Sequence, residues 1–148
     1  MAGHVYLLDT NVLLAALLAP ERLPKEVVAG ISDSSNTVYF SSASIWEVAI
    51  KRSLQRADFD FSPQDIHRLA LDTGFAELMV KGEDCYPIAS LPWHHRDPFD
   101  RLLVAQAQSL PAYLLTTDGV LNQYSELVVH LTLIYPVNGQ QAVIRGFS

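Results

Sequence analysis

The chain has 148 residues, of which 49% are hydrophobic and 18% are charged, and its formal net charge is −6. This composition fits one domain with a substantial buried core, and the negative charge argues against a protein that coats nucleic acid nonspecifically. Cys85 is the only cysteine, which excludes an intramolecular disulfide and leads us to expect a cytoplasmic protein.

The first predicted element is a strand at residues 4–9, HVYLLD, whose continuous apolar run is typical of a strand buried on both faces. Residues 10–19 then predict a helix, for which Thr10 or Asn11 is a candidate cap. This segment has no basic leader, and Asp9 and Asn11 interrupt its apolar stretch. We therefore expect a soluble protein with neither a secretion signal nor a membrane-spanning segment.

Helices and strands then alternate along the chain. In order, we expect a helix at 25–33, a strand at 37–41, helices at 42–54 and 62–74, a strand at 75–80 and a short helix at 83–89. The helix at 62–74 is the best delimited, because Ser62 can cap it, Pro63 occupies its first position and Gly74 can end it.

The C-terminal part contains a helix that starts after Asp97 and runs to residue 110, followed by strands at 112–117 and 128–135. The tail at 136–148 has no clear pattern and is a candidate partner-facing extension. Alternating strands and helices predict a three-layer α/β/α domain over residues 1–148, with a central, mainly parallel sheet of about five strands.

Four acids fall at the junctions between predicted strands and helices: Asp9, Glu47, Asp100 and Asp118. In a parallel sheet these junctions share one edge, so we expect the four side chains to converge. Each acid also has a structural explanation as a helix cap, an ion-pair partner or a turn residue. Ser44 and Glu47, for example, fit a capping box.

Convergence of the four carboxylates would raise their pKa values unless cations neutralised them. Lys51 and Arg101 are the nearest candidates in the sequence, and they do not match the four junctions. Mg²⁺ and Mn²⁺ prefer carboxylate and water ligands. The pattern therefore predicts that a hard divalent cation neutralises the acids, with Asp9 as one of its ligands.

Four segments carry a resemblance to a known family: LLDTNVLL (7–14), SSASIWEVAIK (41–51), LPWHHRDPFDRLLVAQA (91–107) and LLTTDGVL (114–121). Their order and spacing resemble those of PIN-domain ribonucleases, specifically the VapC-type toxins of bacterial toxin–antitoxin pairs. The resemblance implies a single nuclease domain that hydrolyses RNA phosphodiester bonds with Mg²⁺ or Mn²⁺, leaving a 5′-phosphate and a 3′-hydroxyl.

By position, the resemblance assigns the family's acidic quartet to Asp9, Glu47, Asp100 and Asp118. We expect Asp9 and Asp100 to be the principal metal ligands, while the other two complete the shell or help to deprotonate the nucleophile. Thr10 corresponds to the family's hydroxyl and would orient Asp9 or hold a water, with Asn11 supporting the loop.

Asp97 is expected to cap the helix, although it too could reach the metal. The resemblance also implies three partners: an RNA substrate (tRNA, rRNA or mRNA), a cognate antitoxin and a second copy of the chain in a homodimer. Leu17, Leu18 and Val28 are candidates for the partner-facing side, but a place in the core is the stronger interpretation for each of them.

The loop before residue 97 contains Trp93, His94, His95 and Arg96. Adjacent histidines lack the spacing of a zinc site, so we expect loop packing with exposed polar tips. Alternatively, Trp93 could stack on a base and Arg96 could contact phosphate.

Lys51, Arg52 and Arg56 form the densest basic cluster of the chain. A solvated helix end and a contact with the RNA backbone explain these three residues equally well.

Other functions fit less well. A haloacid-dehalogenase-like phosphatase needs a second Asp where Asn11 stands, and a receiver domain needs a Lys that the segment 116–118 does not supply. A catalytically silent binding module, or an RNA-processing nuclease outside a toxin–antitoxin pair, remains the alternative.

Overall fold

Five parallel strands form the centre of the computed structural model, which describes residues 3–54 and 59–135. The strands are β1 (Val5–Leu8), β2 (Thr37–Ser41), β3 (Ala76–Leu78), β4 (Tyr113–Thr116) and β5 (Val128–His130). Their spatial order is β3-β2-β1-β4-β5, and every neighbouring pair is parallel. The tail at 136–148 and Arg56 lie outside the described residues.

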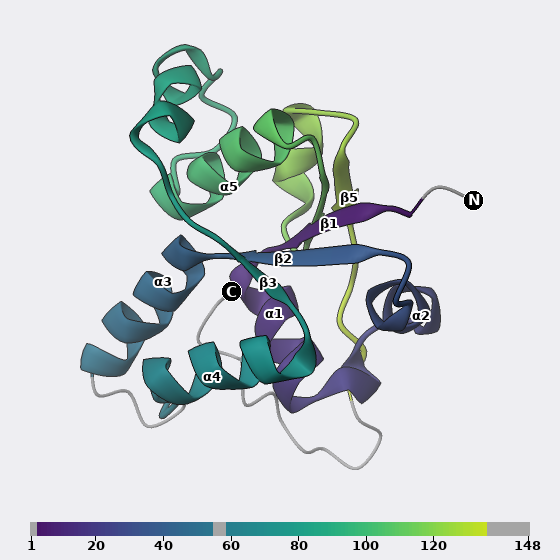
Figure 1. The fold of residues 1–148 in the computed structure, drawn as a ribbon. Coiled ribbons are helices and arrows are strands. Elements are labelled where there is room, and N and C mark those ends of the chain that lie inside the picture. The colour runs from purple at the N-terminus through teal and green to yellow at the C-terminus, as the bar shows by residue number, and fades with distance from the viewer. Residues whose placement is uncertain (1–2, 55–58, 136–148) are drawn as a thin grey trace.

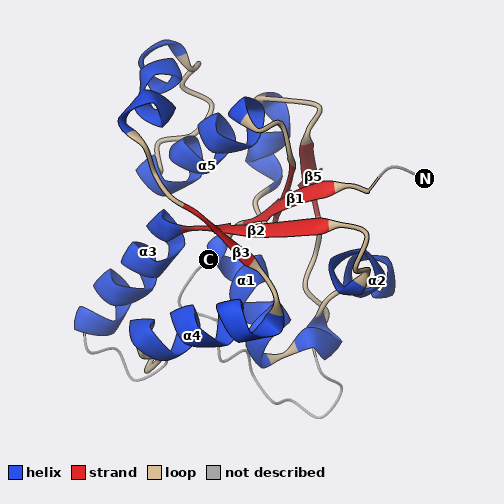
Figure 2. Cartoon of the chain, in the orientation of Figure 1, coloured by secondary structure: helices blue, strands red, loops and turns tan. Residues whose placement is uncertain are grey.

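Helices cover both faces of this sheet (Figures 1 and 2). They are α1 (Thr10–Leu18), α2 (Lys25–Ser32), α3 (Ser42–Ser53), α4 (Pro63–Thr73) and α5 (Pro98–Ser109), with three 3₁₀ helices, η1 (Pro20–Arg22), η2 (Gly82–Ser90) and η3 (Gly119–Gln123). In Figure 1, α1 to α4 lie on one side of the sheet and α5 lies on the other. The predicted three-layer α/β/α fold is confirmed.

The two central strands contribute to the cores on both sides of the sheet. Leu8 and Leu115 pack with α1 and α4, whereas Leu7 and Leu114 pack with α5. All four leucines are buried. Because successive side chains of a strand point to opposite faces, a strand covered on both sides must be apolar throughout. This explains the uninterrupted apolar run before Asp9.

Local signals set most helix boundaries as expected. The Ser62 hydroxyl accepts the N–H of Asp65 at 3.3 Å at the start of α4, and Gly74 ends that helix with φ of 101°. Asp97 caps α5. By contrast, α3 begins at Ser42 and is capped by Ser41, so a capping box, the structural explanation considered for Glu47, does not form.

The predicted strand at 128–135 was wrong in length, since β5 ends at His130. The Leu131 N–H still bonds to the Thr116 carbonyl at 2.8 Å, but the Ile134 N–H bonds to the Arg22 carbonyl at 2.7 Å. The chain thus leaves the sheet toward η1. Its apolar residues pack beside the core and therefore have the sequence pattern of a longer strand.

The strand order places a topological switch point between β1 and β4. The chain first moves from β1 outward to β2 and β3, and then returns to add β4 on the other side of β1. In open α/β sheets, ligands bind at the carboxyl ends of the strands at such a point. Within the part of the chain that is described, no helix is long and apolar enough to cross a membrane.

Candidate active site

The four predicted acids come together at the carboxyl edge of the sheet, around the switch point. Asp9 directly follows β1, and Asp118 follows β4 by two residues. Glu47 lies in the second turn of α3 and Asp100 lies in the first turn of α5. These two helices cover opposite faces of the sheet and contact each other near its edge, which brings their acids toward the strand ends.

Asp9 is the most buried of the acids, with 5% of its surface exposed. Its carboxylate accepts the Val12 N–H at 2.8 Å, the Thr116 hydroxyl at 2.6 Å and the Thr117 N–H at 3.2 Å. Burial raises the pKa of Asp9, and these hydrogen bonds oppose the rise. Asp9 thus caps α1 and is also held firmly at the switch point.

Glu47 is tied to the end of β1 through Thr10. The Thr10 hydroxyl lies 2.7 Å from Oε1 of Glu47 and 2.9 Å from the Ser44 hydroxyl. Burial raises the pKa of Glu47, while Thr10 and Lys51 lower it in part. The contacts therefore pair Thr10 with Glu47, whereas Thr116 orients Asp9.

Asn11 supports the adjoining loop as expected, because its side-chain N–H donates to the Thr117 hydroxyl at 3.0 Å.

Asp100 has the most strongly perturbed pKa. Burial, followed by repulsion from Asp97, Asp9, Glu47 and Asp118, raises the pKa of Asp100 to about 8. The other four acids therefore all lie within electrostatic range of Asp100. Asp97 uses one carboxylate oxygen to accept the N–H groups of residues 99 and 100, at 2.8 and 3.4 Å, as expected of a helix cap.

His95 joins the acidic cluster, although we expected its polar tip to be exposed. Its Nε2 lies 2.5 Å from Oδ2 of Asp118 and 3.4 Å from Oδ2 of Asp100. The ligand atoms of these three residues all lie within 4.8 Å of one another. The one available sequence signal was its position five residues before Asp100, in the loop that leads into α5. His94 instead packs against the ring of Tyr124.

Arg101 is buried next to Asp100 but does not neutralise the acids. Its guanidinium donates to four carbonyls and a hydroxyl in the neighbouring loops and stacks on the ring of Trp93, 3.9 Å from the ring centroid. Arg101 therefore organises the loop that carries His95. The acids retain their mutual repulsion.

The donor set fits a hard divalent cation. Carboxylate oxygens converge from four separate segments, and the raised pKa values of Asp9, Glu47 and Asp100 show that the ionised forms of these three acids lack sufficient compensation. A divalent ion supplies that compensation and prefers oxygen ligands. Asp9, Glu47, Asp100 and Asp118 would hold it.

Aromatic side chains flank the acids. Trp46, directly before Glu47, is 61% exposed and packs edge-on against Phe99, directly before Asp100, with ring centroids 5.0 Å apart. Trp93 is also exposed on one side. In the basic cluster, Lys51 is half-buried, and exposed Arg52 donates to the Asp60 carbonyl.

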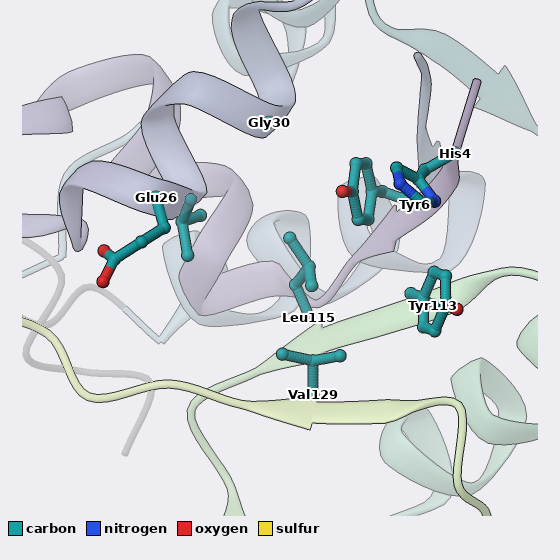
Figure 3. Close-up of a pocket in the computed structure, with 8 residues that line it drawn as sticks. His4, Tyr6, Glu26, Gly30, Tyr113, Leu115 and Val129 are labelled. Atoms are coloured by element: carbon teal, nitrogen blue, oxygen red, sulfur yellow. The ribbon is translucent and has the colours of Figure 1, made fainter. Parts of the chain in front are cut away.

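A cavity of about 300 Å³ lies apart from these acids, between α2 and strands β1, β4 and β5 (Figure 3). Its lining is mainly apolar, with the rings of His4, Tyr6 and Tyr113 about 6 Å apart. Glu26 is the only acid among its lining residues. This cavity therefore offers no cluster of carboxylates for a metal ion.

Comparisons with known proteins agree with this architecture. A family model described as "PIN domain" matches residues 6–127. A search of the curated proteins gives no significant match.

Two solved structures have a similar fold. VapBC2 from Rickettsia felis, bound to a DNA fragment from its promoter, has a chain that is 15% identical, with a TM-score of 0.65 over 87% of this chain and 98% of that one. VapBC-1 from nontypeable Haemophilus influenzae has a chain that is 21% identical, with a TM-score of 0.56 over 81% and 91%.

Proposed function

The chain belongs to the PIN-domain family, and from this premise we propose that it is a metal-dependent endoribonuclease and the toxin of a type II toxin–antitoxin pair. The observation that carries the proposal is the convergence of four carboxylates at the switch point, with a pKa of about 8 at Asp100. Such a site suits a divalent ion better than it suits a structural role, because without the ion the acids destabilise one another.

Each acid has a distinct task in this proposal. Asp9 and Asp100 are the principal ligands of one or two Mg²⁺ or Mn²⁺ ions, and Glu47 and Asp118 complete the shell. Thr10 orients Glu47, whose raised pKa suits its carboxylate to accept a proton from the attacking water. When bound, the ion lowers the pKa of water and stabilises charge on the leaving oxygen.

RNA is the proposed substrate. The Trp46–Phe99 pair, of which Trp46 is exposed, lies beside the acids, where a base next to the scissile phosphate could stack on it. Trp93 offers a second exposed ring on the loop before α5. Stacking on unpaired bases favours single-stranded regions of tRNA, rRNA or mRNA over a duplex.

The toxin role draws on the similar solved structures, both of which are VapBC assemblies. We propose that a cognate antitoxin inhibits the chain and that the chain forms a homodimer in the cytoplasm. Light scattering after size exclusion tests the dimer. A small gene beside this one that encodes a DNA-binding protein, and co-purification of its product, would support the pairing.

The first experiment is cleavage of a mixed tRNA and rRNA pool by the purified chain, freed of any bound partner, with Mg²⁺ or Mn²⁺. Asp100→Asn removes a proposed ligand. Asp72→Asn makes the same chemical change at an exposed position of α4 and is the matched control.

We expect wild type and Asp72→Asn to cut RNA, whereas Asp100→Asn or added EDTA abolishes the cuts. Cuts that persist with EDTA would refute a metal nuclease. A wild-type chain that neither cuts RNA nor binds Mn²⁺ would favour the silent binding module.

A further inference from the structure

His95 is held in a single tautomer by the main chain. Its Nδ1 lies 2.9 Å from the backbone N–H of Asp97, which can only donate a hydrogen bond. Nδ1 must therefore accept, and in the neutral ring the proton lies on Nε2. That N–H is directed at Oδ2 of Asp118, 2.5 Å away.

We propose that His95 is a positioning residue of the metal site, which orients the Asp118 carboxylate through Nε2–H and is not itself a metal ligand. This inference rests on the proposed function, because it concerns the same site. It adds a residue outside the predicted quartet and gives that residue a specific hydrogen bond.

A nitrogen ligand is the competing interpretation, since His95, Asp100 and Asp118 are close enough to hold one ion. Binding through Nε2 requires its lone pair, and the proton would then move to Nδ1. That proton would face the N–H of Asp97, so two donors would oppose each other. The observed hydrogen bond therefore favours His95 as a donor.

Main-chain contacts fix the position of the loop that carries His95. The His95 N–H donates to the Tyr124 hydroxyl at 2.9 Å, and Nη1 of Arg101 lies 3.4 Å from the His95 carbonyl and 3.3 Å from the same hydroxyl. Arg101 belongs to α5, and Tyr124 directly follows η3. The loop is thus attached to α5, which carries Asp100, and to the end of η3, which Asp118 caps.

The hydrogen bond from His95 orients the Asp118 carboxylate but leaves lone pairs available on its oxygens. Oδ2 accepts from His95 and Oδ1 accepts the N–H of Val120 at 3.0 Å. Each carboxylate oxygen has two lone pairs, so one on each remains available to a cation. Partners that orient metal ligands in this way contribute strongly to affinity, since their removal commonly weakens binding about 10–100-fold.

The test combines calorimetric Mn²⁺ binding with NMR of the histidine ring, on folded full-length protein checked by circular dichroism. His95→Ala removes the donor, whereas His95→Gln places an amide N–H at similar reach. His94→Ala is the control, because His94 is the exposed neighbour. We expect about a tenfold or greater loss of Mn²⁺ affinity in His95→Ala. His95→Gln should stay within about threefold of wild type, and His94→Ala should be unchanged.

In the NMR arm, two-bond ¹H–¹⁵N spectra at pH 8 should show the Nε2–H tautomer of His95 with and without diamagnetic Mg²⁺. A proton that moves to Nδ1 when Mg²⁺ binds would overturn the inference in favour of a ligand. Unchanged Mn²⁺ affinity in His95→Ala, with wild type binding Mn²⁺ and cutting RNA, would refute this inference alone. A wild type that binds no Mn²⁺ would remove both this inference and the proposed function.

Discussion

Replacing Asp100 by Asn should stabilise the metal-free protein while it abolishes metal-dependent activity. The pKa of Asp100 is raised from 3.8 to about 8, so the native state holds its proton across a range in which the unfolded chain releases it. Wherever the native state binds more protons, stability falls as pH rises. The stability contributed by the protonated carboxyl is therefore complete below about pH 4 and is lost as pH rises toward 8.

The magnitude follows from the size of that shift. At about 1.4 kcal/mol per pKa unit, the raised pKa of Asp100 lowers the free energy of unfolding at pH 8 by at most about 6 kcal/mol, relative to a carboxyl with the unshifted pKa. Neighbouring acids that take up protons reduce this effect, as does the 19% exposure of the Asp100 side chain. We expect Asp100→Asn to stabilise the metal-free chain by about 2 kcal/mol at pH 8, or about 4–8 °C in Tm. The gain should be small at pH 4, where Asp100 is neutral in the native state and, with a pKa of 3.8, only about half ionised in the unfolded chain.

The assay is urea and thermal unfolding in EDTA at pH 4 and pH 8, with Asp72→Asn as the matched control. Mn²⁺ at 100 times its Kd should stabilise wild type by about 2.7 kcal/mol, and it should stabilise Asp100→Asn less. If Asp100→Asn is no more stable than wild type at pH 8 in EDTA, the repulsion among these acids has been misjudged.

Three further substitutions probe other parts of the chain. Thr116→Val removes the 2.6 Å hydrogen bond to buried Asp9, so calorimetry should show about tenfold weaker Mn²⁺ binding. Thr116→Ser keeps a hydroxyl and should restore the affinity. Wild-type affinity in Thr116→Val would contradict the role of Thr116 in orienting Asp9. Gln106→Leu replaces a buried side-chain amide that has no hydrogen-bond partner among the described residues. Urea unfolding should show that the free energy of unfolding rises by about 1 kcal/mol. A fall in the free energy of unfolding would mean that the amide does have a hydrogen-bond partner. Trp46→Ala should weaken the binding of single-stranded RNA about tenfold, measured by fluorescence anisotropy, and should leave the Mn²⁺ affinity unchanged. The same change at exposed Tyr86 is the control and should have no effect. Unchanged RNA affinity in Trp46→Ala would exclude the Trp46–Phe99 pair as a stacking platform.

The sequence alone determined most of the helices and strands and the edge of the sheet at which the acids gather. Apolar runs predicted the buried strands, and Ser62, Gly74 and Asp97 marked helix ends, because these signals depend on a few neighbouring residues. Since strand ends share one edge in a parallel sheet, the convergence of the acids also followed from their positions. The length of β5 could not be predicted from the sequence, because an apolar segment that packs beside the core has the same pattern as a strand.

Only the tertiary structure decided which side chains meet. Thr116 lies 107 residues from Asp9 in sequence, and Thr10 lies 37 residues from Glu47, so no local pattern connects them. The same holds for His95, which reaches Asp118 across 23 residues because Arg101 and Tyr124 fix its loop. The raised pKa of Asp100 is likewise largely a property of the assembled edge, since burial and the repulsion of the three carboxylates that are distant in sequence, Asp9, Glu47 and Asp118, arise only once the strands and helices have packed.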